Sequence, residues 1–92
     1  MSDMKEPYLE VTFRHGRPMA AYLYLPRGIG EKSYRTSKAA PGMVIDFGPS
    51  GNPIGIEITA PTKVTVEALN NVLGKLGLPP MKDNELAPLR AA

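Results

Sequence analysis

Hydrophobic and polar residues alternate along two segments near the start of the chain, and this alternation predicts two half-buried strands over residues 8–13 and 19–25. The apolar side of the first strand comprises Leu9, Val11 and Phe13, and that of the second comprises Met19, Ala21, Leu23 and Leu25. Arg14-His15-Gly16 between them has the length and the glycine of a three-residue hairpin loop, with Gly16 at positive φ. This register predicts that Val11 faces Met19.

A second hairpin is indicated by two apolar runs, residues 43–47 and 54–59, which are separated by a turn rich in glycine and proline. The expected cross-strand pairs are Phe47 with Ile54, Ile45 with Ile56, and Met43 with Ile58. The reverse side would then carry Val44, Asp46, Gly55, Glu57 and Thr59. The polar segment Ser33 to Lys38 predicts a further strand at an edge of the sheet.

One helix is expected from Val66 to Leu76, because leucine and valine recur there at the spacing of an apolar stripe. Thr65 is the expected N-cap, and Gly77 is placed for a left-handed residue that ends the helix. The apolar stripe consists of Leu69, Val72, Leu73 and Leu76. Its expected partners on the sheet are Val11, Met19, Leu23, Ile45, Ile56 and Ile58.

These elements together predict an α+β fold, in which an antiparallel sheet of four to five strands, a meander of hairpins, carries the C-terminal helix on one face. Residues 1–81 would form a single domain, and residues 82–92 a polar, flexible tail. A chain of 92 residues is long enough for one hydrophobic core but not for two.

Composition removes several function classes. The sequence has no cysteine, so a disulfide, a thiolate zinc site and a thiol nucleophile are excluded. It has no run of about 18 apolar residues and no basic and apolar leader at its start, so we expect a cytoplasmic protein without a membrane segment. We expect no cofactor and no catalytic activity.

Charge is asymmetric, since residues 1–40 carry seven Lys or Arg and four acids, whereas residues 41–92 carry four and five. A nucleic-acid-binding module is therefore an alternative function, because phosphate neutralisation supplies much of such affinity. Its cations would be Arg14, Arg17, Arg27, Lys32, Arg35 and Lys38. The single histidine, His15, has no carboxylate close to it in the sequence, and we expect it to be an exposed turn residue.

Three carboxylates, Glu10, Asp46 and Glu57, fall on the reverse side of the predicted sheet. Such a group could hold a hard cation or act as an acid–base pair, and this makes a carboxylate metal-site enzyme the third hypothesis. The favoured interpretation is that they are solvated sheet residues paired with Arg17, Arg35 or Lys63.

Tyrosines with basic neighbours favour binding over catalysis. Tyr8, Tyr22 and Tyr24 share the reverse side of the predicted sheet, and such residues can anchor a protein interface. The predicted binding residues are Tyr22, Tyr24, Tyr34, Arg14, Arg17 and Arg35. We expect a small interaction module that engages a protein partner through a sheet face or edge, and that forms a homodimer through the reverse face or an exposed edge.

The segment from Gly42 to Ile58, read as GMVIDFGPSGNPIGIEI, resembles the signature of small bacterial proteins grouped as domain-of-unknown-function family 2283. In that family, a strand ending in Asp and an aromatic residue, a glycine-containing turn and a Gly-Ile-Glu-Ile strand follow an N-terminal hairpin, which residues 8–25 resemble. The resemblance supports the predicted fold and implies no established activity.

Overall fold

The computed structural model describes residues 7–26 and 32–90, so Arg27, one of the six predicted nucleic-acid-binding cations, lies outside the described residues. The strands are β1 (Tyr8–Arg14), β2 (Arg17–Tyr24), β3 (Arg35–Ala40), β4 (Met43–Phe47) and β5 (Pro53–Ile58). The helix is α1 (Val66–Lys75), and the short 3-10 helices are η1 (Pro61–Lys63), η2 (Asp83–Glu85) and η3 (Ala87–Arg90). The α+β class predicted from the sequence is confirmed.

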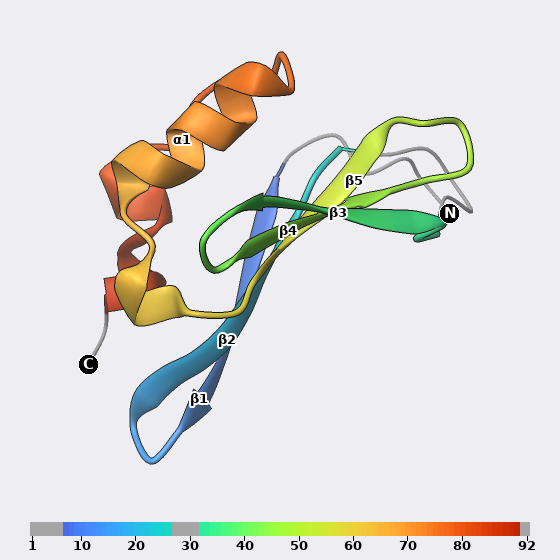
Figure 1. Ribbon diagram of the computed structural model, residues 1–92. Helices are drawn as coiled ribbons and strands as arrows, with labels where there is room; N and C mark the ends of the chain where they lie inside the picture. The colour runs from blue at the N-terminus through green and yellow to red at the C-terminus, as the bar shows by residue number, and fades with distance from the viewer. Residues whose placement is uncertain (1–6, 27–31, 91–92) are drawn as a thin grey trace.

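All five strands form one sheet in the order β1-β2-β5-β4-β3 (Figure 1). A simple meander is therefore not the order of this sheet. The hairpin β1–β2 and the meander β3–β4–β5 are joined by antiparallel pairing of β2 with β5. This pairing places β1 and β3 at the two edges, which confirms the edge position expected for the third strand.

The first hairpin has a tighter turn than the sequence analysis predicts. His15 and Gly16 both have positive φ, at 54° and 76°, and Arg14 faces Arg17 across a two-residue turn. Such turns match the twist of the strands that they join. Val11 consequently faces Ala21, so the predicted pairing with Met19 is wrong. Pairing shifts between Thr12 and Phe13, and Met19 is left out of the ladder with its side chain 49% exposed.

The second hairpin confirms the pairs of Met43 with Ile58 and of Ile45 with Ile56. A shift between Asp46 and Phe47 places Phe47 opposite Pro53, so its predicted pairing with Ile54 is wrong. Met43, Ile45, Ile56 and Ile58 of this hairpin lie in the core, and Met43 and Ile56 are almost completely buried.

Both predicted ends of the helix are confirmed. The Thr65 hydroxyl accepts a hydrogen bond from the backbone N–H of Ala68 at 3.0 Å. At the other end Gly77 has a φ of 75°, and the N–H of Leu78 donates to the carbonyl of Leu73 at 2.9 Å, which closes the helix as a Schellman motif. In the described residues, no helix has the length and apolar composition needed to cross a membrane.

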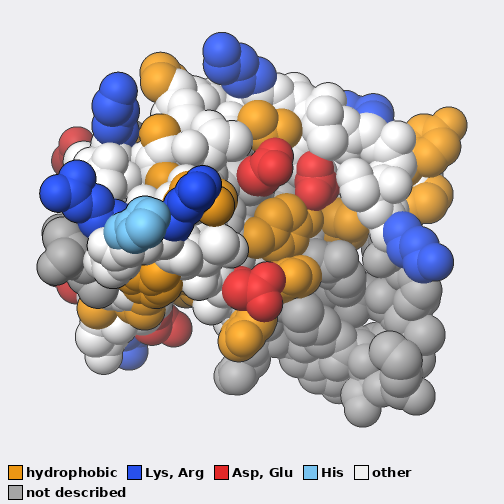
Figure 2. All heavy atoms as spheres, turned by 90° about the horizontal axis from the view of Figure 1, so that it is seen from below, with side chains coloured by type: hydrophobic (Ala, Val, Ile, Leu, Met, Phe, Trp, Pro, Cys, Tyr) orange, Lys and Arg blue, Asp and Glu red, His pale blue; other side chains and the backbone are white. Residues whose placement is uncertain are grey.

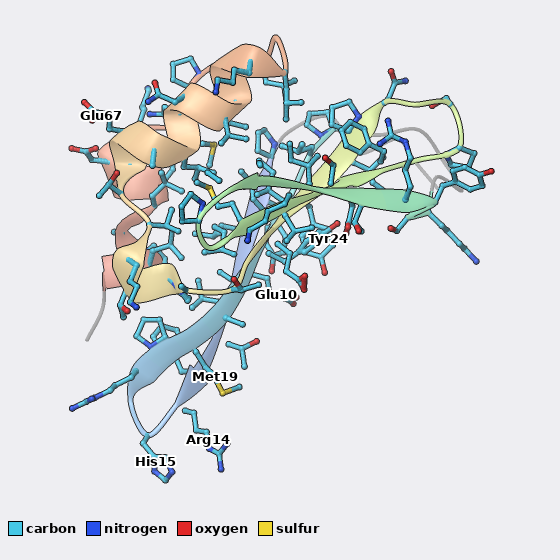
Figure 3. The ribbon with its side chains drawn as sticks, viewed as in Figure 1. Glu10, Arg14, His15, Met19, Tyr24 and Glu67 are labelled. Atoms are coloured by element: carbon cyan, nitrogen blue, oxygen red, sulfur yellow. The ribbon has the colours of Figure 1, made fainter. Side chains whose placement is uncertain are left out.

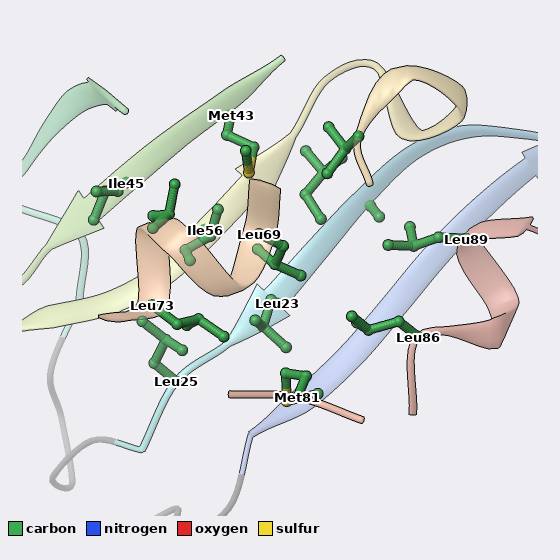
Figure 4. Close-up of a cluster of buried hydrophobic side chains, with 14 residues drawn as sticks. Leu23, Leu25, Met43, Ile45, Ile56, Leu69, Leu73, Met81, Leu86 and Leu89 are labelled. Carbon is green, nitrogen blue, oxygen red and sulfur yellow. The ribbon is translucent and has the colours of Figure 1, made fainter. Parts of the chain in front are cut away.

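One buried cluster joins the helix to the sheet (Figure 4). Leu69, Val72 and Leu73 of α1 belong to the same cluster as strand residues such as Leu23 and Ile56. Of the sheet partners expected for the helix, Met19 is exposed and Val11 is only partly buried.

The core also extends past residue 81, where the sequence suggested the start of a flexible tail. Leu86 and Leu89 are 0% and 5% exposed and complete the cluster from the C-terminal side. The side chain of Asn70 in α1 ties this segment down, because it donates to the carbonyl of Met81 at 3.1 Å and accepts from the N–H of Met81 at 2.8 Å. The difference from the expected tail arises because two isolated leucines in a polar segment can each fill a place in a core that other elements build.

Candidate functional site: the reverse face, the β3 edge and the β1–β2 hairpin tip

The reverse face of the sheet, opposite the helix side, is organised in two rows of side chains that run across all five strands. Cross-strand pairing defines the first row as Glu10, Tyr22, Glu57, Val44 and Lys38. The second row consists of Tyr8, Tyr24, Gly55, Asp46 and Thr36. The predicted sharing of this face by tyrosines and carboxylates is therefore confirmed, and the rows show how they interact.

Tyr22 reaches from the first row into the second. Its hydroxyl donates a hydrogen bond to Oδ2 of Asp46 at 2.7 Å, although Tyr22 lies on β2 and Asp46 lies on β4, with β5 between them. This path is open because the intervening residue is Gly55. A Cβ atom at that position would overlap the ring and hydroxyl of Tyr22. The Tyr22 ring therefore packs directly against the backbone of Gly55, in the space that a side chain at this position would occupy.

Tyr24 forms a second tyrosine–carboxylate contact, since its hydroxyl donates to Oε1 of Glu10 at 3.2 Å (Figure 3). Its ring also lies edge-on to Tyr22, with centroids 4.6 Å apart, and tilted against Tyr8 at 5.7 Å. Such edge and tilted arrangements are the favoured ones for aromatic pairs. The three tyrosines therefore form one continuous cluster along β1 and β2.

These contacts determine what the carboxylates can do. Glu10 and Asp46 each accept a tyrosine hydroxyl, and Glu57 is exposed on β5. Within residues 7–26 and 32–90, no three side chains of His, Asp or Glu lie close enough together to hold a metal ion jointly. The geometry accordingly makes Glu10 and Asp46 hydrogen-bond acceptors that orient the tyrosines.

The β3 edge presents a different surface. Tyr34, just before the strand, is 74% exposed, and its backbone N–H donates to the carbonyl of Phe47 at 2.7 Å. The guanidinium carbon of Arg35 lies 4.2 Å from the centroid of the Phe47 ring, within range of a cation–π interaction. The first four residues of β3 are exposed. The edge therefore presents cationic and aromatic groups beside backbone that no other strand of the described sheet pairs with.

The tip of the first hairpin is cationic. Arg14 and Arg17 face each other across the turn, and like charges in such cross-strand pairs repel. Figure 2 shows Lys or Arg side chains on both sides of the chain's one histidine. A hollow of about 460 Å³ is lined by Arg14, His15, Arg17, Pro18 and Met19.

Comparison with known proteins supplies the family of this sheet. Residues 20–60 match the family described as "Protein of unknown function (DUF2283)". These residues are a DUF2283 segment within the chain. Neither the search of curated proteins nor that of solved structures gave a significant match.

The DUF2283 segment runs from Ala20 in β2 to the residues just after β5. It contains Tyr22, Gly55 and Asp46, the three residues of the contact that crosses the sheet. The hairpin tip and α1 lie outside it. The DUF2283 segment therefore contains the β3 edge and most of the tyrosine–carboxylate contacts of the reverse face. Tyr8 and Glu10, on β1, complete these contacts from outside the segment.

The six binding residues predicted from the sequence do not form one site in the structure. Tyr22 and Tyr24 meet on the reverse face, Arg14 and Arg17 meet at the hairpin tip, and Tyr34 and Arg35 lie at the β3 edge. Sequence reasoning missed two residues that shape these surfaces. The alternation pattern marks Gly55 only as a reverse-side position, and the contact of Arg35 with Phe47 depends on the register of the β3–β4 hairpin, which no sequence signal specified.

Proposed function

We propose that this protein is a binding module that adds an extended segment of a protein partner to its sheet at the β3 edge. The observation that carries the proposal is the exposure of β3 as an edge strand beside Tyr34. Main-chain hydrogen bonds supply affinity in this mode of recognition, and alternate side chains supply specificity.

Several edge features favour such a partner. Residues 35–40 contain no proline, so each residue of β3 keeps its backbone N–H. Edge strands are commonly protected from pairing by proline, a bulge or charged side chains. The irregular pairing of β3 with β4 begins only after Lys38, so residues 35–38 keep a regular edge. Tyr34 and the stacked Arg35 add side chains of the types that contribute most to interfaces.

Charge indicates the chemistry of the partner. Residues 32–40 contain Lys32, Arg35 and Lys38 and no acidic residue. An extended segment that carries Asp or Glu would therefore be attracted to the edge and held in register by it.

The reverse face is the less favoured surface. Tyr22 and Tyr24 are half-buried, and their hydroxyls already donate to carboxylates of the same sheet. A partner docking there would have to break or cover these bonds, and an unpaired buried carboxylate is costly. Tyr34 is far more exposed and lies at an edge where a new strand can pair.

The test uses two short fluorescent peptides, one alternating valine with glutamate and one alternating valine with lysine. We expect the acidic peptide to bind and its affinity to fall by at least about tenfold in the variant Arg35→Glu/Lys38→Glu. The variant Lys63→Glu/Lys75→Glu is the matched control, because it changes the net charge equally at exposed positions away from β3. An equal loss of affinity in both variants would show that net charge alone explains the effect and would contradict a site at β3. Absence of binding by the acidic peptide would also contradict the proposal.

A second candidate function, nucleic-acid binding, is favoured by one observation, the facing pair of Arg14 and Arg17. A phosphate between these two cations would relieve their repulsion. Binding of labelled DNA and RNA oligonucleotides should then weaken steeply with salt. Replacing both arginines by glutamine should reduce the slope of log affinity against log salt by about two. An unchanged slope would exclude the hairpin tip as the contact.

A further inference from the structure

The second edge of the sheet, β1, differs in character from β3. Its seven residues alternate between the two faces, with Leu9, Val11 and Phe13 on the helix side. Leu9 and Val11 are partly buried against the core, whereas Phe13 is 46% exposed. Tyr8, at the start of the strand, is 58% exposed. A long edge with exposed apolar groups is a surface that commonly pairs with another strand.

The sequence of β1 is complementary to itself when a second copy runs antiparallel to it. With the two-fold axis at Val11, each Val11 faces its counterpart, and Leu9 faces Phe13 of the second copy. On the other face, Tyr8 meets Arg14 of the second copy, which suits a cation–π contact, and Glu10 meets Thr12. All seven residues of the strand find a partner, and no like charges face each other.

Other registers are poorer. An axis at Glu10 would place the two glutamates opposite each other, which is destabilising. An axis at Thr12 would pair Glu10 with Arg14 but would leave Tyr8 and Leu9 beyond the paired strands. A shift of one residue would turn the apolar side of one copy toward the polar side of the other.

The β3 edge does not offer the same match. Pairing of two β3 strands about Ser37 would place Arg35 opposite Ala39 and Thr36 opposite Lys38, with no contact between large apolar groups. The two edges are therefore suited to different partners.

We propose that a second copy of this chain pairs with β1 in antiparallel orientation, with the two-fold axis at Val11. The two sheets then form one continuous sheet, and each β3 lies at an outer edge. The dimer leaves the β3 edge open in both copies, so it is compatible with the proposed function and does not depend on it.

Association is tested by sedimentation equilibrium over a wide concentration range. Phe13→Glu and Met19→Glu form a matched pair, because these side chains are 46% and 49% exposed and lie in the same hairpin. We expect Phe13→Glu to raise the dimer dissociation constant at least about tenfold, since symmetry doubles the effect of each lost contact. Met19→Glu should leave it within about twofold. A wild-type protein that stays monomeric up to about 1 mM, or two variants with equal effects, would overturn the proposal.

The register is tested by single cysteines in this cysteine-free chain. The proposed axis brings the two Val11 Cα atoms to about 5 Å, which a disulfide can span. The two Thr12 Cα atoms would lie about 8 Å apart, beyond that range. Mild oxidation should therefore cross-link Val11→Cys and leave Thr12→Cys monomeric under denaturing electrophoresis. Cross-linking of Thr12→Cys in preference, or of neither variant, would overturn the register.

The dimer and the peptide site can be tested separately. Arg35→Glu/Lys38→Glu should dimerise normally, because both residues lie on β3 and not on β1.

Discussion

Replacement of Gly55 by alanine should destabilise the protein, although alanine at a glycine in a strand ordinarily stabilises it by about 0.5–1 kcal/mol. The reason is steric, because the added Cβ would overlap the ring and hydroxyl of Tyr22. Tyr22 would have to leave the sheet surface, and its hydrogen bond to Asp46 at 2.7 Å would be lost. A hydrogen bond to a charged group contributes about 1.5–3 kcal/mol. The half-burial of both partners favours the lower end, and the ordinary gain from alanine offsets part of it, so we expect a net loss of about 1 kcal/mol.

Urea denaturation followed by circular dichroism measures this loss. With a slope of about 1 kcal/mol per molar urea, the midpoint should fall by about 1 M. Gly74→Ala is the matched control, because a Cβ at that position in α1 meets nothing within 4 Å and alanine favours a helix. It should raise the free energy of unfolding by about 0.5–1 kcal/mol.

A double-mutant cycle decides whether the Tyr22 ring is the cause. In a Tyr22→Ala background, the added methyl group at Gly55 has no ring to displace, so the cost of Gly55→Ala should vanish. An equal cost of Gly55→Ala with and without the ring would refute the reasoning.

Three further substitutions test the rest of the fold in the same assay. Leu86→Ala should lower the free energy of unfolding by about 2–5 kcal/mol, because the Leu86 side chain is fully buried. An unchanged midpoint would show that the C-terminal segment is not part of the core. Thr65→Ala should cost about 1 kcal/mol by removing the N-cap, and Thr65→Ser should retain most of that stability; equal losses would exclude the cap. Gly77→Ala should destabilise the protein where Gly74→Ala stabilises it, because Gly77 alone of the two has a positive φ; the same sign for both would contradict the Schellman closure.

Local patterns in the sequence were sufficient for the parts of the fold that local interactions determine. The helix begins after Thr65 and ends before Gly77 because capping and left-handed closure involve only neighbouring residues. The second hairpin was predicted in its main register because its apolar residues align in only one way on a single buried face.

The first hairpin shows where such reasoning fails. Met19 continues the apolar alternation, so a register that buries it looked consistent. The left-handed conformation of His15 permits the shorter turn, and the irregularity after Thr12 then leaves Met19 outside the ladder. Asn and Asp adopt this conformation more readily than His does, so no strong local signal marked the turn.

Long-range pairing limited the prediction of the site. The contact of Tyr22 with Asp46 requires β5 to lie between β2 and β4, and no local pattern shows that β2 pairs with β5 rather than β3. The role of Gly55 follows only from that order. The tyrosines and carboxylates were correctly placed on one face because alternation within each strand was enough to assign a side.

The most direct test of the proposed binding module is amide hydrogen exchange along β3 with and without the acidic peptide. Strand addition protects the outward-facing backbone N–H groups of the edge to which the strand is added. With the acidic peptide bound, amide exchange should slow at alternate residues within Arg35–Ala40 and at no position in α1. Protection confined to the reverse-face strands or the hairpin tip, with β3 unchanged, would contradict strand addition at β3.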